Sequence, residues 1–254
     1  MTAAAHDALL LAARNLLRIK RSPDMLVGVT FQPIMFVVLF TYVFGGAIST
    51  PGFTYIDFFL PGIVIQMIAF TGYATALGIS DDLRKGLIDR FRSLPMARSA
   101  VIAGRTASDV VMNTIALTTM VVFGLIVGFS FHAPGYEIVA GFALVLLFGY
   151  AMSWVYCYIG LIASSPESAS ALITVVIFPL TFVSSVYVPT DSMPAFFEAI
   201  ANANPITTIV DALRALWLDA PAGTDIWVSV LWCAGITAVF AVLATARYRS
   251  TVAR

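Results

Sequence analysis

A basic segment at residues 81–105 carries the side chains best suited to specific binding. It reads DDLRKGLIDRFRSLPMARSAVIAGR and holds six of the chain's 14 lysine and arginine residues: Arg84, Lys85, Arg90, Arg92, Arg98 and Arg105. Guanidinium groups bind phosphates and carboxylates through charge-assisted hydrogen bonds. Long apolar runs that carry almost no charge lie on both sides. The segment therefore predicts a binding surface at the edge of a membrane.

The middle of this segment has the pattern of a short amphipathic helix. Gly86 can end the preceding helix, and Pro95 stops the turn that follows. Between them apolar residues recur at helical spacing with charged residues in the gaps: Leu87, Ile88, Phe91 and Leu94, with Asp89, Arg90 and Arg92. A basic loop on phospholipid headgroups explains the arginines equally well. An aromatic residue flanked by arginines is typical of protein interfaces, so we predict that this helix binds a partner protein.

The elements that position this segment are membrane spans. The chain has 254 residues, of which 60% are hydrophobic and 11% charged, whereas soluble domains are about 25% charged. A bilayer requires roughly 20 apolar residues per helix. We predict an all-α membrane protein in which residues 25–254 form a single transmembrane domain. Its six spans lie near residues 25–48, 58–79, 107–129, 137–163, 169–188 and 226–246.

The distribution of basic residues orients these spans. With the N-terminus inside, the inner segments are 1–24, 80–106, 164–168 and 247–254, and they hold every lysine and arginine except Arg214. Basic residues collect on the cytoplasmic side of membrane proteins. We therefore predict a multi-pass protein of a bacterial plasma membrane with both termini in the cytoplasm.

Two further segments predict helices outside the spans. Residues 1–24 read as an interfacial amphipathic helix, because Arg14, Arg18 and Arg21 share one face that can lie among lipid headgroups. A solubilising extension is the alternative. Between the last two spans, proline-bounded stretches at 192–203 and 205–219 predict short external helices. They would cap the spans from outside, and a plain connecting loop is the alternative.

The predicted spans carry no ionisable residue in the middle of a run. Asp57, Asp109 and Glu137 fall near span ends. Proton- and ion-coupled transporters usually need titratable groups near the membrane midplane, so a secondary transporter is disfavoured. A ligand within the spans would be held by aromatic, methionine and hydroxyl side chains. The candidate cleft residues are Phe36, Phe40, Phe70, Tyr73, Met112, Phe178 and Phe182, although helix packing or lipid contact explains such residues as well.

Four motifs in sequence order resemble one known family. They are YIDFFLPGI at Tyr55–Ile63, KGLIDRFRSLPMARS at Lys85–Ser99, FPLTFVSSVYVPTDSMP at Phe178–Pro194 and NPITTIVDALRAL at Asn204–Leu216. These stretches are similar to the permease subunits of ABC-2 type transporters, and most similar to the daunorubicin/doxorubicin-resistance branch. Many members of the broader family have an acidic residue before the glycine of the basic segment, whereas this chain has Lys85.

The resemblance implies a division of labour between chains. The helix at 86–95 would be the coupling helix that docks on a separate ATP-binding cassette ATPase, and the N-terminal helix would touch the same subunit. The chain has no G-x-x-x-x-G-K-[ST] phosphate loop, so we expect it not to be an enzyme and to hold no metal or cofactor. ATP and Mg would bind the ATPase, present in two copies, beside a second permease chain that forms a homodimer or heterodimer.

This implied activity is export of a lipophilic, drug-like or antibiotic-like compound, with membrane lipids as surroundings and no nucleic acid as partner. Permeases of the same family for lipid, glycan or cell-envelope precursors are one alternative. A membrane scaffold or immunity protein that docks a soluble partner without transport is the other.

Overall fold

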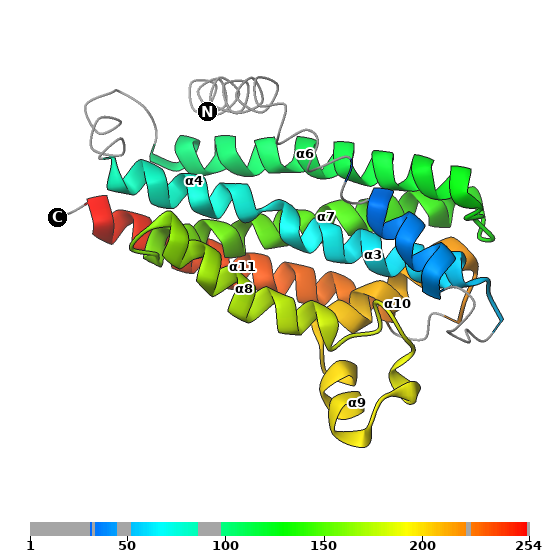
Figure 1. The fold of residues 1–254 in the computed structure, drawn as a ribbon. Helices are drawn as coiled ribbons and strands as arrows, with labels where there is room; N and C mark the ends of the chain where they lie inside the picture. Colours follow the sequence, from blue (N-terminus) through cyan, green and yellow to red (C-terminus); the bar gives the residue numbers. More distant parts are fainter. Residues whose placement is uncertain (1–30, 32–33, 45–51, 86–97, 222–224, 253–254) are drawn as a thin grey trace.

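A computed structural model describes residues 31, 34–44, 52–85, 98–221 and 225–252, and these residues form helices joined by short links (Figure 1). Residues 34–44 are helical and end in a five-residue π-helix, η1 (Phe40–Phe44). The other elements are α3 (Tyr55–Thr71), α4 (Tyr73–Arg84), α6 (Arg98–Val127), α7 (Gly135–Ile162), α8 (Pro166–Phe182), η2 (Thr190–Ser192), α9 (Ala195–Asn202), α10 (Pro205–Leu218) and α11 (Asp225–Val252).

Four stretches of helix in the described part are long and apolar enough to cross a bilayer. They are Tyr55–Arg84, Ser108–Val127, Gly135–Ile162 and Asp225–Tyr248, and they correspond to the second, third, fourth and sixth predicted spans. The first and fifth predicted spans correspond to shorter apolar helices, Ile34–Val43 and Pro166–Phe182. The all-helical membrane fold is therefore confirmed, and the count of six spans stays a prediction.

The fifth predicted span is shorter than expected because its helix stops before the apolar run does. We predicted a span to residue 188, but α8 ends at Phe182, three residues after Pro179. The Asn204 side-chain amide donates to the carbonyls of Leu180 and Val183 at 2.6 and 2.7 Å. These bonds satisfy carbonyl groups that the helix end leaves without helical partners.

Helix α7 lies at the centre of the bundle and packs against α3, α4, α6, α8, α10 and α11 (Figure 1). Its glycines allow these close approaches. A side chain at Gly141 would collide with Trp217 of α10, and one at Gly160 would meet the carbonyl oxygen of Ala76 in α4 at 2.6 Å. Small residues take this role in membrane helices, where close van der Waals contact drives association.

The two predicted external helices are present but differ from each other in burial. Helix α10 is packed into the bundle against α3, α7 and α11, and Trp217 is fully buried. Helix α9 projects from the side of the bundle (Figure 1), with Phe196 71% exposed. The external loop is therefore more than a cap, because α10 forms part of the core.

The second predicted span is divided in two at Gly72. Helix α3 ends at Thr71 and α4 begins at Tyr73, and the amides of Thr75 and Ala76 both donate to the Gly72 carbonyl. The Tyr156 ring from α7 fills the space where a Gly72 side chain would lie. Its hydroxyl donates to the carbonyl of Ala69. A neighbouring helix thus satisfies a backbone group at the break, as the apolar membrane interior requires.

The close approach of α7 to α4 gives a testable prediction. Gly160→Ala should destabilise the protein by about 1–3 kcal/mol, because the added methyl group overpacks backbone atoms that have no room to move. The matched control is Gly235→Ala in α11, where nothing lies within 4 Å of the new methyl group. Thermal unfolding of detergent-solubilised protein measures both. Equal midpoints for the two variants would contradict the packing at Gly160.

Candidate functional site

Six aromatic side chains from four parts of the chain form a continuous row. We call Phe36, Phe40, Phe59, Tyr187, Phe182 and Phe178 the aromatic row. Phe40 stacks on Phe36 and Phe59, with ring centroids 5.9 and 5.0 Å apart. Tyr187 lies 5.3 Å from Phe40 and 5.1 Å from Phe182. Phe182 stacks on Phe178 at 4.2 Å, so the rings connect residues 34–44, α3 and α8.

The aromatic row runs from the core of the bundle to its surface. Phe59 is fully buried, Phe36, Phe40 and Tyr187 are half-buried, and Phe178 and Phe182 are 48% and 45% exposed. Stacked and tilted aromatic contacts of this kind are favourable packing interactions. The exposed rings of Phe178 and Phe182 also present apolar surface at the outer end of the row.

Polar atoms lie at the inner part of the row. The Tyr187 hydroxyl donates to Oε1 of Gln66 at 2.5 Å, and Gln66 is buried within the apolar helix α3. Tyr55, whose ring lies 5.5 Å from that of Phe59, has a buried hydroxyl with no hydrogen-bond partner among the described residues. The buried Thr41 hydroxyl in η1 also has no hydrogen-bond partner among the described residues. Such groups can hydrogen-bond to a polar substituent on an otherwise apolar ligand.

The row includes four of the seven predicted cleft residues: Phe36, Phe40, Phe178 and Phe182. The other three lie elsewhere. The Tyr73 hydroxyl is hydrogen-bonded to Ser170 of α8, Met112 is buried on α6, and Phe70 packs against the core. Whether the row binds a substrate stays a prediction.

Sequence reasoning missed Gln66, Tyr55 and Tyr187. One signal was present, since Gln66 is an isolated amide within an apolar run. An amide in that setting needs a buried partner.

The other predicted sites lie outside the described residues. These are the coupling helix, from Gly86 to Pro95, and the interfacial arginines Arg14, Arg18 and Arg21. The structure does describe the two helices that flank the coupling segment. Near the end of α4, Asp81 pairs with Lys85 at 2.6 Å and with Arg84 at 3.7 Å.

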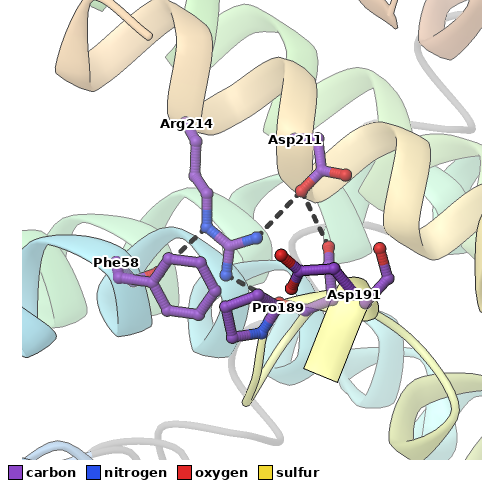
Figure 2. A pocket seen from close by; sticks show the side chains of 7 residues that line it. Phe58, Pro189, Asp191, Asp211 and Arg214 are labelled. Carbon is purple, nitrogen blue, oxygen red and sulfur yellow. Dashed lines mark hydrogen bonds and ion pairs between the residues drawn. The ribbon is translucent and has the colours of Figure 1, made fainter. Parts of the chain in front are cut away.

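A buried arginine joins three elements of the bundle (Figure 2). Arg214 of α10 donates from Nε to the Phe58 carbonyl at 3.0 Å, from Nη1 to Asp211 at 2.9 Å and from Nη2 to the Ser185 carbonyl at 2.7 Å. Its Cζ lies 3.6 Å from the centroid of the Phe58 ring. The side chain therefore holds α3, α10 and the segment after α8 together.

The charge of Arg214 is maintained despite its burial. Burial lowers the pKa of Arg214 to about 10, and the neighbouring Asp211 carboxylate opposes that shift. The guanidinium thus stays protonated at neutral pH. A pocket of about 370 Å³ opens beside it and is lined by Phe58, Ser185, Pro189, Thr190, Asp191, Asp211 and Arg214 (Figure 2). The burial of Arg214 could not be predicted from the sequence, because hydropathy does not show that α10 is packed inside the bundle.

These features define the class of protein: a multi-pass helical membrane protein with an aromatic row that reaches the surface of its bundle. The sequence model of the ABC-2 type transporter family matches residues 7–218. The daunorubicin resistance ABC transporter permease protein DrrB1 of Streptomyces coeruleorubidus is 33% identical over 237 residues, which cover 93% of this chain and 84% of that protein.

Two more distant relatives agree. The doxorubicin resistance ABC transporter permease protein DrrB of Mycobacterium tuberculosis is 26% identical over 72% of this chain and 66% of its own length. The inner membrane transport permease YadH of Escherichia coli is 23% identical over 79% of this chain and 80% of its own length. The chain belongs to the ABC-2 type transporter family, and the resemblance drawn from its motifs is confirmed.

The contacts of Arg214 give the second prediction. Arg214→Leu should lower the stability of folding by about 3–5 kcal/mol, because it leaves buried carbonyls without donors. Asp211→Asn is the comparison variant and should lower the stability less. Asp211 is partly exposed, and asparagine keeps an oxygen that can accept hydrogen bonds from Arg214 and Ser185. Unfolding midpoints in detergent should fall much further for Arg214→Leu. An unchanged midpoint for Arg214→Leu would contradict the joining role of the side chain.

Proposed function

We propose that this chain is the transmembrane permease subunit of an exporter that moves lipophilic compounds out of a bacterial cell. Energy would come from ATP and Mg bound by two copies of a separate ATP-binding cassette ATPase. Membership of the ABC-2 family and the resistance named for two relatives support this proposal. Both termini would lie in the cytoplasm, as the distribution of basic residues indicates.

The observation that carries the export proposal is the aromatic row. The side chains of its outer members, Phe178 and Phe182, are about half exposed at the surface of the bundle. A lipophilic compound could enter there, pass along stacked rings and meet the Gln66–Tyr187 hydrogen bond inside. A second permease chain, either a copy or a related chain, would close the opposite side of this path.

Conformational changes of the ATPase would be transmitted to the permease through α4 and α6. The predicted coupling helix lies in the segment between the end of α4 at Arg84 and the start of α6 at Arg98. Movement of that segment by the ATPase would shift both helices. Such a rigid-body shift of helices is an established way to convert binding at one site into a change at another.

The third prediction tests the aromatic row. Phe182→Ala should reduce ATP-dependent export of daunorubicin from cells that also contain the cognate ATPase, because it removes the ring between Tyr187 and Phe178. Losing this stacking surface predicts a loss of about fivefold or more in transport. The matched control is Val175→Ala, which is 72% exposed on the same helix. Fluorescence of retained daunorubicin measures export. Equal export by both variants would show that the row is ordinary helix packing.

The fourth prediction tests the coupling helix. Phe91→Ala and Arg92→Glu should leave the protein in the membrane but abolish transport driven by ATP hydrolysis, because they remove the apolar anchor and reverse a charge at the docking surface. Reconstituted complexes report ATPase activity and transport separately. Normal transport by both variants would contradict the docking assignment. Stimulation of ATPase activity by lipid or envelope precursors, and by no drug, would favour the alternative substrates.

A further inference from the structure

We infer that the hydrogen bond between Thr75 and Asp109 is a transmission contact that makes α4 and α6 move together. This inference rests on the proposed function, and it adds two positioning residues to it. Thr75 Oγ1 donates to Asp109 Oδ1 at 2.7 Å, and both side chains are more than nine-tenths buried. Neither residue was among the predicted functional residues.

The hydrogen bond joins the two helices that flank the predicted coupling helix. Helix α4 ends at Arg84 and α6 begins at Arg98, so the predicted coupling helix lies in the chain segment between them. In the described part of the chain, α4 and α6 each pack against α7, and the Thr75–Asp109 bond joins them directly. A force that the ATPase exerts on the segment between them would act on both helices at once. The Thr75–Asp109 hydrogen bond would keep the two helices from separating under that force.

Asp109 is a buried carboxylate near the end of a span. The apolar, membrane-length part of α6 begins at Ser108, so Asp109 lies near a span end, as the sequence predicts. Its side chain is nevertheless buried, and a buried carboxylate is costly unless hydrogen bonds compensate it. The Thr75 hydroxyl donates one such bond to Oδ1 of Asp109.

The regular helix is interrupted at Gly72, between α3 and α4. We expect a change of angle between α3 and α4 to occur at this interruption. Thr75 lies three residues beyond it and links α4 to α6. Helix α6 in turn packs against α3, where Leu60 meets Gly124, and α3 carries Phe59 and Gln66. Movement of α4 and α6 as one unit would therefore reach the aromatic row.

A polar neighbour extends this contact toward α7. Asn113 lies one helical turn after Asp109 on α6, and it is buried with its amide against Gly149 of α7. A side chain at Gly149 would collide with that amide. Buried polar side chains of α6 thus lie against both α4, at Thr75, and α7, at Gly149.

The fifth prediction compares two substitutions at Thr75. Thr75→Val keeps the shape but lacks the hydroxyl, whereas Thr75→Ser keeps the hydroxyl. In reconstituted complexes with the ATPase, Thr75→Val should retain ATP hydrolysis while transport of daunorubicin per ATP falls about fivefold, the order of effect expected for one contact in a coupling network. Thr75→Ser should restore most of the ratio. Ser153→Ala is the control, because among the described residues that buried hydroxyl bonds to its own helix, at the Gly149 carbonyl.

A second readout does not require knowledge of the substrate. Spin labels at Arg84 of α4 and Val111 of α6, both on exposed side chains, report the separation of the two helices. On addition of ATP the wild-type distance should stay constant, whereas in Thr75→Val it should widen or broaden. A constant distance in both, or an unchanged transport ratio in Thr75→Val, would overturn the inference. A wild-type complex that hydrolyses ATP and moves no drug, with the label distances as expected, would overturn the proposed substrate class instead.

Discussion

Inside a bilayer no water is available to hydrogen-bond the backbone groups that are exposed where a helix is interrupted. The fold therefore depends on side chains that supply these hydrogen bonds. At two interruptions of the helices, another element supplies a donor. The Tyr156 hydroxyl donates to Ala69 at the Gly72 break, and the Asn204 amide donates to Leu180 and Val183 at the end of α8. Within α3, Arg214 donates to the Phe58 carbonyl. An unsatisfied carbonyl in a bilayer costs several kcal/mol, so these donors help the helices to end where they do.

The same interruptions position the parts that the proposed mechanism uses. The end of α8 releases the chain into the turn that carries Tyr187, which completes the aromatic row beside Phe182. The break at Gly72 separates the helix that carries Gln66 from the helix that leads to the predicted coupling segment. Arg214 holds α3 to α10 and to the segment after α8. In the proposed mechanism α4 would move relative to this part of α3.

Much of the fold could be predicted from the sequence because hydropathy and family motifs are strong signals over long stretches. The second, third, fourth and sixth predicted spans appear as apolar helices, and the two short helices before the last span appear as α9 and α10. The start of α6 could not be predicted, because its first residues are basic and hydropathy does not distinguish a charged helix from a charged loop. The Gly72 break could not either, since a lone glycine in an apolar run is a weak signal.

The candidate site was predictable in part for the same reasons. Aromatic residues in the first and fifth predicted spans were expected near a cleft, and Phe40 and Phe182 do lie in one row. Gln66, Tyr55 and Tyr187 were missed because their roles come from contacts between distant segments, which no local pattern records. The burial of Arg214 and Asp109 could not be predicted either, because it comes from contacts between elements that are distant in the sequence.

We propose that ATP bound by a partner drives a lipophilic compound through this chain. Daunorubicin uptake into inside-out membrane vesicles that contain the permease and its ATPase tests this directly. We expect uptake that requires hydrolysable ATP and persists when a protonophore collapses the proton gradient. Uptake that continues without ATP and stops when the gradient collapses would contradict ATP-driven export, because the protein would then be a secondary transporter.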